Sequence, residues 1–225
     1  MLVAIDSDLW VAEQPISFLG VPLGARMVVA RLPSGELWLW SPLRRDGVLA
    51  DEIERLGAIA WLIAPNRFHH LYVGEWQRAH PSAKTLLAPG LAAKRADLRA
   101  DGVLGDSPDP GYAETFAQLP VEGQPWINET AFLHRPSGTL LLADLAFHYP
   151  GERAGRVGWM RRILGTYDRF GPSRLERLAV RDRAAMRRSI DAILAWDFER
   201  VIVAHGKILE RGGADALRKA YDWLG

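Results

Sequence analysis

The chain has 225 residues, 48% of them hydrophobic, and its 28 basic and 27 acidic side chains leave a formal net charge of +1. This length and hydrophobic content predict one folded domain over residues 1–225, and the balanced charge gives no general attraction to nucleic acid or to a membrane. The absence of cysteine excludes disulfides, thiol nucleophiles and thiolate metal ligands. We expect a cytoplasmic protein, because the N-terminus lacks a signal-peptide pattern and no apolar run is long enough to span a bilayer.

The first half of the chain predicts a β-hairpin followed by alternating helices and strands. Apolar segments at 27–32 and 36–41 flank the turn sequence Pro-Ser-Gly. The continuous apolar run at 58–65 predicts a strand that is covered on both faces. A short strand is also expected at 84–89, and helical spacing of apolar residues predicts helices over 45–57, 71–81 and 90–102.

The second half repeats this pattern. Residues 126–148 predict a second hairpin around Pro-Ser-Gly, and the run at 198–206 predicts another apolar strand between helices over 180–197 and 213–225. The arginine-rich segment 158–188 contains acids at helical spacing, which indicates a solvated helical face rather than a nucleic-acid patch. Together these elements indicate an α/β fold of mixed sheets with helices outside.

Polar residues follow four of the predicted strands, one of which leads to Ser41. The other three carry candidate ligands. The first strand leads to the adjacent His69 and His70, the second to Asp144 and the third to His205. Strand ends are where ligand groups converge in folds of this kind, so these residues could meet around one cation. Imidazole and carboxylate suit zinc, and equally iron or manganese. His148 is close enough to Asp144 along the chain to line the same cleft.

Each of these residues also has an ordinary structural interpretation. Asp144 can close an Asx turn, and His205 can be a core histidine bonded to a backbone carbonyl. We expect His80 at the surface end of a helix, His134 exposed in a hairpin strand, and Ser41 in a turn. The sequence contains no Gly-rich phosphate loop, nucleophile elbow or dinucleotide fingerprint.

The order of these segments resembles the metallo-β-lactamase superfamily, and more closely a poorly characterised family of unknown function at its edge, found in bacteria and plants. The matching stretches run through most of the chain, at 37–46, 61–76, 127–147 and 201–209. This resemblance implies a four-layer αββα sandwich of two mixed β-sheets flanked by helices, with the site at one edge of the sheets.

In that superfamily, a strand leads into an H-x-H-x-D-H motif that supplies ligands to two metals. The resemblance aligns His70 with the last histidine of the motif and His69 with its aspartate. Pro65 and Arg67 fall where the first two histidines should be, and neither side chain can bind a metal. The resemblance therefore implies that one of the two metal sites is lost.

The resemblance also aligns Asp144 with a bridging aspartate and His205 with the final histidine, while Glu129 or Asn128 lies nearest to the middle histidine. It implies one divalent metal, with zinc expected first and iron or manganese as alternatives. The implied ligands are His69, His70, Asp144 and His205.

Two neighbouring residues have open roles beside this site. Arg67 would place positive charge where the missing metal sat, either to hold an anionic substrate group or to pair with Glu129 or Asp144. Asn66 would supply a further oxygen ligand or cap the following segment.

The resulting hypothesis is a metal-dependent hydrolase in which metal-activated water attacks an ester, thioester, amide or phosphoester of a small molecule. Asp144 would orient that water, and His148 would be a proton shuttle. The alternative is a non-catalytic relative that binds a small molecule or a protein, and a third possibility is redox chemistry at a bound iron. We expect neither nucleic acid nor membrane as a partner, and the sequence does not determine the oligomeric state.

Overall fold

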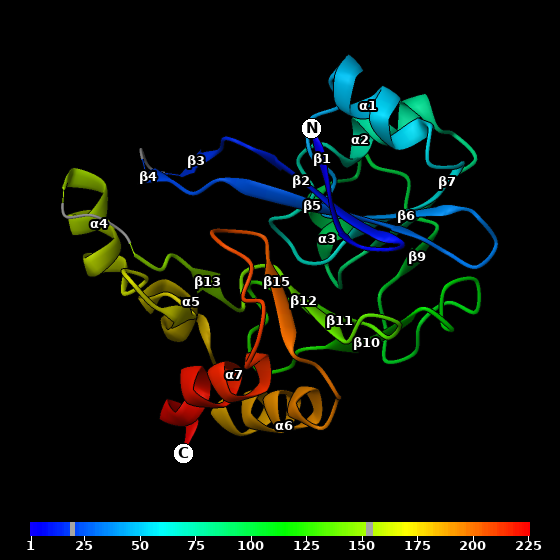
Figure 1. The fold of residues 1–225 in the computed structure, drawn as a ribbon. Coiled ribbons are helices and arrows are strands. Elements are labelled where there is room, and N and C mark those ends of the chain that lie inside the picture. The colour runs from blue at the N-terminus through cyan, green and yellow to red at the C-terminus, as the bar shows by residue number, and fades with distance from the viewer. Residues whose placement is uncertain (19–20, 152–154) are drawn as a thin grey trace.

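The computed structural model describes residues 1–18, 21–151 and 155–225. Two β-sheets lie face to face, with helices against the outer face of each (Figure 1). The predicted αββα sandwich is therefore confirmed. None of the helices in the described part of the chain is long and apolar enough to cross a membrane.

The first sheet has seven strands in the order β1-β2-β5-β6-β7-β8-β9. The strands from β1 to β6 pair antiparallel, whereas β6, β7, β8 and β9 run parallel to one another. Their bounds are β1 (Leu2–Asp6), β2 (Leu9–Gln14), β5 (Ala25–Arg31), β6 (Leu37–Trp40), β7 (Ile59–Ala64), β8 (Lys84–Leu87) and β9 (Gly102–Val103).

The second sheet has four strands in the order β10-β11-β12-β15. β10, β11 and β12 form an antiparallel meander, and β15 pairs parallel to β12. Their bounds are β10 (Phe116–Pro120), β11 (Thr130–His134), β12 (Thr139–Leu142) and β15 (Arg200–Val203). Because β12 and β15 are parallel neighbours, the residues that follow them emerge at the same edge of the sheet.

Side chains alternate between the two faces of each sheet, which explains the continuous apolar runs of the sequence. In β6, Trp38 and Trp40 face the second sheet, whereas Leu37 and Leu39 face the helices. Trp38 stacks on Phe116 of the second sheet with 4.0 Å between the ring centroids. The core between the sheets is therefore built from large aromatic side chains.

Four helices cover the sandwich from outside. α1 and α2 pack on the first sheet through Leu49, Ile53 and Trp76. α6 and α7 pack on the second sheet through residues such as Ile190 and Leu217. Their bounds are α1 (Gly47–Glu54), α2 (Val73–Ala79), α6 (Arg183–Leu194) and α7 (Gly213–Tyr221), with the 3₁₀ helix η1 (Asp222–Leu224) after α7.

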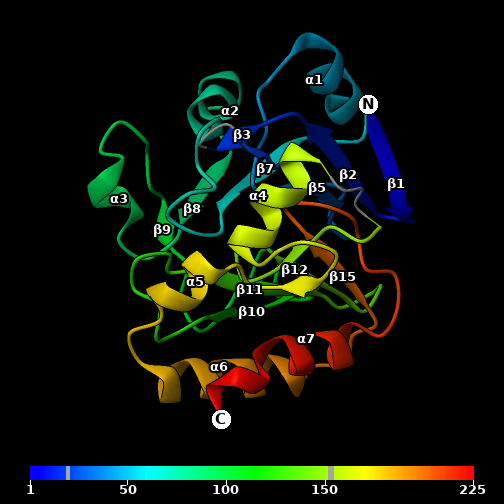
Figure 2. The ribbon, with the colours of Figure 1, turned by 90° about the vertical axis from the view of Figure 1, so that its left-hand side faces the viewer.

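Short elements gather beside one end of the sandwich, where α4 and α5 stand in front of the sheets (Figure 2). Two short antiparallel pairs, β3 with β4 and β13 with β14, accompany them. The bounds are β3 (Ser17–Phe18), β4 (Val21–Pro22), β13 (Phe147–His148), α4 (Arg156–Leu164), β14 (Phe170–Gly171) and α5 (Arg174–Ala179).

The predicted helix over 90–102 is much shorter in the structure, where α3 covers only Leu91–Lys94. Arg95 leaves the helical conformation, with φ −129° and ψ 63°. Its guanidinium binds the carboxylate of Asp97 and the ring of His70. These side-chain contacts replace a continued helix.

Candidate functional site

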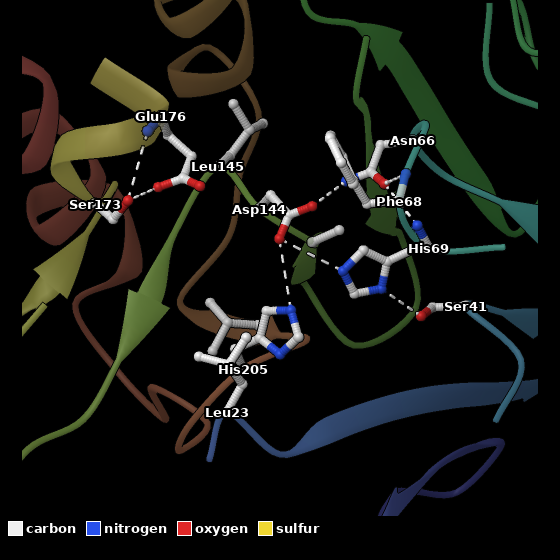
Figure 3. Close-up of polar contacts among 12 residues, drawn as sticks. Leu23, Ser41, Asn66, Phe68, His69, Asp144, Leu145, Ser173, Glu176 and His205 are labelled. Carbon is white, nitrogen blue, oxygen red and sulfur yellow. Dashed lines mark hydrogen bonds and ion pairs between the residues drawn. The ribbon is translucent and has the colours of Figure 1, made fainter. Parts of the chain in front are cut away.

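Three of the predicted ligands come together at the ends of their strands. His69 follows β7, Asp144 follows β12 and His205 follows β15, and one ligand atom from each lies within 4.8 Å of the others. Figure 3 shows both imidazole rings directed at the carboxylate of Asp144. Among the residues that the structure describes, this is the one such group of three or more candidate metal ligands.

The spacing of these atoms fits a bound cation. Nε2 of His69 and Nε2 of His205 each lie 3.5 Å from Oδ1 of Asp144. Ligands at 2.0–2.1 Å from a tetrahedral metal are separated by about 3.3 Å, so the donors need only small shifts. The residues present therefore fit a bound metal ion.

The ring of His205 is oriented for metal binding. Its Nδ1 lies 2.6 Å from the carbonyl oxygen of Gly24, which can only accept, so Nδ1 carries a proton and Nε2 is the ring nitrogen that faces Asp144. The ring also stacks on Phe147, with 5.4 Å between centroids and 11° between planes. A second hydrogen bond of this kind fixes the tautomer of a metal-binding histidine.

Ser41 orients the ring of His69, a role that goes beyond the turn residue expected after the strand. Its hydroxyl lies 2.7 Å from Nδ1 of His69, and the side chain is 4% exposed. Ser41 has φ 52°, an uncommon conformation for a residue with a side chain, directly after β6. Its position after the strand "LWLW" was the available signal, but a hydroxyl partner 28 residues away along the chain leaves no local pattern.

A buried network holds the carboxylate of Asp144 in place. Nδ2 of Asn66 donates to Oδ2 of Asp144 at 2.7 Å and to Oε2 of Glu129 at 3.1 Å. Glu129 in turn accepts from the backbone N–H groups of Ala143, Asp144 and Leu145, at 2.6, 2.7 and 3.2 Å. Oδ2 of Asp144 is thus occupied, and Oδ1 is left facing the histidines.

The pKa values of the two carboxyl groups move in opposite directions. Burial would raise the pKa of Asp144, but the charge of His69 and the hydrogen bonds from His205 and His69 outweigh it and hold that pKa well below its usual range. Burial raises the pKa of Glu129 to about 8, and the charge of Asp144 adds to this increase. Asp144 is therefore the ionised member of the pair and the one suited to bind a cation.

Asn66 matches the capping interpretation and not the ligand interpretation. Its Oδ1 accepts from the backbone N–H groups of Phe68 and His69, both at 2.8 Å. These bonds occupy the amide oxygen and fix the loop that carries His69. Glu129 lies behind Asp144, where its carboxylate binds the backbone rather than the site.

His70 is not part of the cluster of His69, Asp144 and His205, and its ring is engaged elsewhere. Arg95 donates Nη1–H to Nδ1 of His70 at 2.7 Å, so Nδ1 is an acceptor and the proton lies on Nε2. Burial, followed by the charges of Lys94 and Arg95, lowers the pKa of His70 to about 4. Neither ring nitrogen is free to bind a metal in this arrangement.

Arg67 and His148 also lie apart from the cluster. Nη1 of Arg67 donates to the carbonyl of Pro125 at 3.2 Å, and no ion pair joins Arg67 to Glu129 or Asp144. Nδ1 of His148 lies 2.9 Å from the carbonyl of Lys207, and its ring packs against Phe170 rather than lining the cavity described below.

The two histidines expected outside the site lie outside it. His80 ends α2 and lies 3.1 Å from Glu54. The expectation that His134 is exposed is wrong, because it is 2% exposed and its Nδ1 lies 2.7 Å from Oγ of Ser137. Burial lowers the pKa of His134 to about 4.

A cavity of about 680 Å³ opens onto the cluster. Its walls come from α4, α5, the loop after β7 and the chain around Leu23, and its base includes Ser41, His69, Asp144 and His205. Glu176 of α5 also lines it, and in the view of Figure 3 its carboxyl group lies on the opposite side of Asp144 from His69. Burial, followed by the charge of Asp144, raises the pKa of Glu176 to about 8.

Comparisons with known proteins find the fold but no relative by sequence. No protein-family model matches the chain, and no curated protein does. Among solved structures, a metallo-β-lactamase from Pontibacter korlensis has a TM-score of 0.69 at 11% identity, covering 100% of this chain and 98% of its own. The mono-zinc form of the metallo-β-lactamase FIM-1 from Pseudomonas aeruginosa has a TM-score of 0.67 at 12% identity, covering 99% and 95%.

A different class of protein shares the same fold. The metal-soaked flavodiiron core of Flv1 from Synechocystis has a TM-score of 0.67 at 13% identity, and the match covers 100% of this chain and 60% of that one. The closer resemblance to the family of unknown function stays a prediction. The geometry and these matches together show that the chain has the metallo-β-lactamase fold.

Proposed function

We propose that the protein is a hydrolase that uses a single metal, bound by His69, Asp144 and His205, to cleave an ester, thioester, amide or phosphoester of a small molecule. The observation that carries this proposal is the convergence of two imidazole nitrogens on one oxygen of Asp144. Zinc hydrolases use two histidines and a carboxylate in this way and leave a coordination position open. When bound, the metal would acidify water and polarise the bond under attack.

The surroundings of the cluster support one metal rather than two. At the positions of the first two motif histidines, Pro65 accepts a hydrogen bond from the backbone N–H of Thr130, and Arg67 reaches toward Pro125. Neither offers a ligand atom for a second cation. The buried Glu129 is fully engaged by backbone N–H groups and cannot replace them.

The chain supplies positioning and proton transfer around the metal. Ser41 and Gly24 set the two imidazole rings so that Nε2 of each faces the site. Glu176 is protonated at neutral pH if its pKa is about 8, and it lies in the wall of the same cavity. In this proposal Glu176, rather than His148, donates the proton that the leaving group takes up.

The same donor set favours a second candidate, redox chemistry at a single iron. Two imidazoles and one carboxylate with open positions are also the ligands of non-haem iron oxygenases. The flavodiiron core among the structural neighbours shares the fold with this chain. Ferrous protein would then consume oxygen in the presence of a reductant, and zinc protein would be inactive.

The test is turnover by reconstituted protein. Metal-free protein is loaded with zinc, with manganese or, without oxygen, with ferrous iron, and is assayed on p-nitrophenyl esters, a thioester, an anilide and a bis-aryl phosphate. We expect metal-dependent hydrolysis of at least one class, reduced on the order of 100-fold in Asp144→Asn. Asp191→Asn is the control, because this carboxylate is exposed on α6.

Two outcomes would contradict the hydrolase proposal. Turnover that is equal with and without metal would remove the cluster from the reaction. Metal-loaded protein that binds compounds but cleaves none would favour the non-catalytic binding module.

A further inference from the structure

The cavity above the cluster has predominantly apolar walls. α4 contributes Trp159, Met160, Ile163 and Leu164, and α5 contributes Leu175. Two loops contribute further apolar side chains, namely Phe68, Leu71, Trp126 and Ile127. Apolar side chains from α4, α5 and two loops thus line the same cavity as His69, Asp144 and His205.

Among the residues that the structure describes, several large apolar side chains at this cavity remain exposed. The exposed fractions are 59% for Trp126, 62% for Trp159, 48% for Ile163, 45% for Leu175 and 55% for Leu71. All five line the cavity. Exposed apolar residues that gather around one concave site mark a place where an apolar ligand is bound.

The shape of the site indicates what kind of ligand fits. A cavity of about 680 Å³ is of the size that encloses a small organic molecule, and a flat protein surface would leave it unfilled. Charged side chains of both signs line it, including Lys94, Arg161 and Asp144, so no single charge is selected. The property shared by its walls is apolar surface.

We propose, on the basis of the hydrolase function above, that the substrate is an ester or thioester with a long apolar acyl chain. The chain lies between α4 and the loops that carry Phe68 and Trp126, and the carbonyl group reaches His69, Asp144 and His205. The oxygen of water bonds to the acyl carbon and the C–O or C–S bond breaks. The departing alcohol or thiol takes one proton, and the acid product releases the other to solution.

The first experiment varies the length of the acyl chain. p-Nitrophenyl esters of four, eight and twelve carbons are compared on the metal-loaded protein. Each buried methylene contributes up to about a fourfold gain in affinity, so kcat/KM should rise at least about tenfold from four to eight carbons. Equal or falling kcat/KM along the series would overturn the proposal.

The second experiment measures binding without turnover. The fluorescence of N-phenyl-1-naphthylamine, and its displacement by methyl dodecanoate, are followed with metal-free wild-type protein and with metal-free Ile163→Glu. Leu178→Glu is the matched control, because Leu178 is 75% exposed on the neighbouring α5 and does not line the cavity. We expect binding of both compounds to weaken at least about tenfold in Ile163→Glu and to be unchanged in Leu178→Glu.

The His205→Ala variant separates this inference from the hydrolase proposal. If the apolar substrate site is correct, His205→Ala still binds methyl dodecanoate although it has lost any metal-dependent turnover. Ligand binding without turnover in metal-loaded wild-type protein would support the apolar site and contradict the hydrolase proposal. Turnover without any effect of Ile163→Glu on binding or on chain-length preference would support the hydrolase proposal and contradict the apolar site.

Discussion

The hydroxyl of Ser41 and the carbonyl of Gly24 each fix one imidazole of the cluster, at 2.7 and 2.6 Å. Such partners matter to a metal site because they orient the imidazole rings, and the carbonyl of Gly24 also places a proton on Nδ1 of His205. Two histidines next to each other in the sequence consequently have different roles. The partner of His69 is the uncharged hydroxyl of Ser41, and Nε2 of His69 faces Asp144. Nδ1 of His70 instead accepts a hydrogen bond from the guanidinium of Arg95, which is always a donor.

Replacing Ser41 by alanine removes the partner of His69 without removing a ligand. We expect metal affinity to fall about 10- to 100-fold, measured by competition with a chelating indicator. Ser137→Ala is the control, because Ser137 makes the same 2.7 Å contact with His134 outside the site. Equal affinities of the two variants would show that Ser41 does not orient a ligand.

Glu129 is expected to contribute to stability rather than to chemistry. Glu129→Leu removes the acceptor of three backbone N–H groups and of the Asn66 amide. Each buried donor without a partner costs about 1–3 kcal/mol, so the free energy of unfolding should fall by about 3 kcal/mol or more in urea denaturation. Glu122→Leu, at an exposed glutamate, should change it by less than about 0.5 kcal/mol, and similar losses in both would contradict the network.

At the scale of single elements, helix α5 combines an N-terminal cap, Ser173, with a side chain that lines the cavity, Glu176. Ser173 caps this helix by accepting from the backbone N–H groups of Leu175 and Glu176, and its hydroxyl bonds the Glu176 carboxyl group. The pattern Ser-x-x-Glu is typical of a helix start, which is why the sequence gives no sign of a functional Glu176. Its second role depends on where α5 packs.

Glu176 also predicts how stability depends on pH. Its pKa is about 8 in the folded protein against an ordinary 4.5, so between these values the folded protein keeps a proton that the unfolded chain has lost. Stability contributed by this proton is present below about pH 4.5 and is lost as pH rises toward 8. In Glu176→Gln, which keeps the cap, this loss should disappear. In thermal melts without metal at pH 8, Glu176→Gln should therefore have a higher Tm than the wild-type protein. An unchanged or lower Tm of the variant at that pH would refute the raised pKa of Glu176.

The elements themselves were predictable to different extents. Strands β5, β6, β7 and β15 follow from apolar runs and turn residues, which are local signals. The helix over 90–102 was wrong beyond Lys94, because Arg95 makes contacts with His70 and Asp97 that helical spacing does not encode. The contact with His70 joins residues 25 positions apart, which is why a local pattern does not predict this boundary.

At the level of the whole molecule, the parallel pairs β6–β7 and β12–β15 bring the site together. They send the residues that follow them to one edge of the sandwich, and this is why a pattern of polar residues after strands predicted His69, Asp144 and His205. The direction of each side chain was not predictable in the same way. Arg95 turns His70 away, and the Asn66–Glu129 network spans 63 residues of sequence.

A contact between the two sheets also holds the chain around His205 in place. Arg26 of β5 donates to the carbonyl oxygens of Val203 and Gly206, which flank His205. The first sheet therefore fixes the strand end of the second, and the distance between His69 and His205 depends on the packing of both sheets. A metal bound between them would link the two halves of the sandwich and should raise the Tm of the protein.

The most direct test of this account is elemental analysis of metal bound to untagged wild-type protein and to His69→Ala, His70→Ala and His205→Ala. The account predicts about one zinc, iron or manganese per chain in wild type and in His70→Ala, and none in the other two variants. No metal in wild type after incubation with each ion, two metals per chain, or loss of metal in His70→Ala with retention in His205→Ala would contradict it.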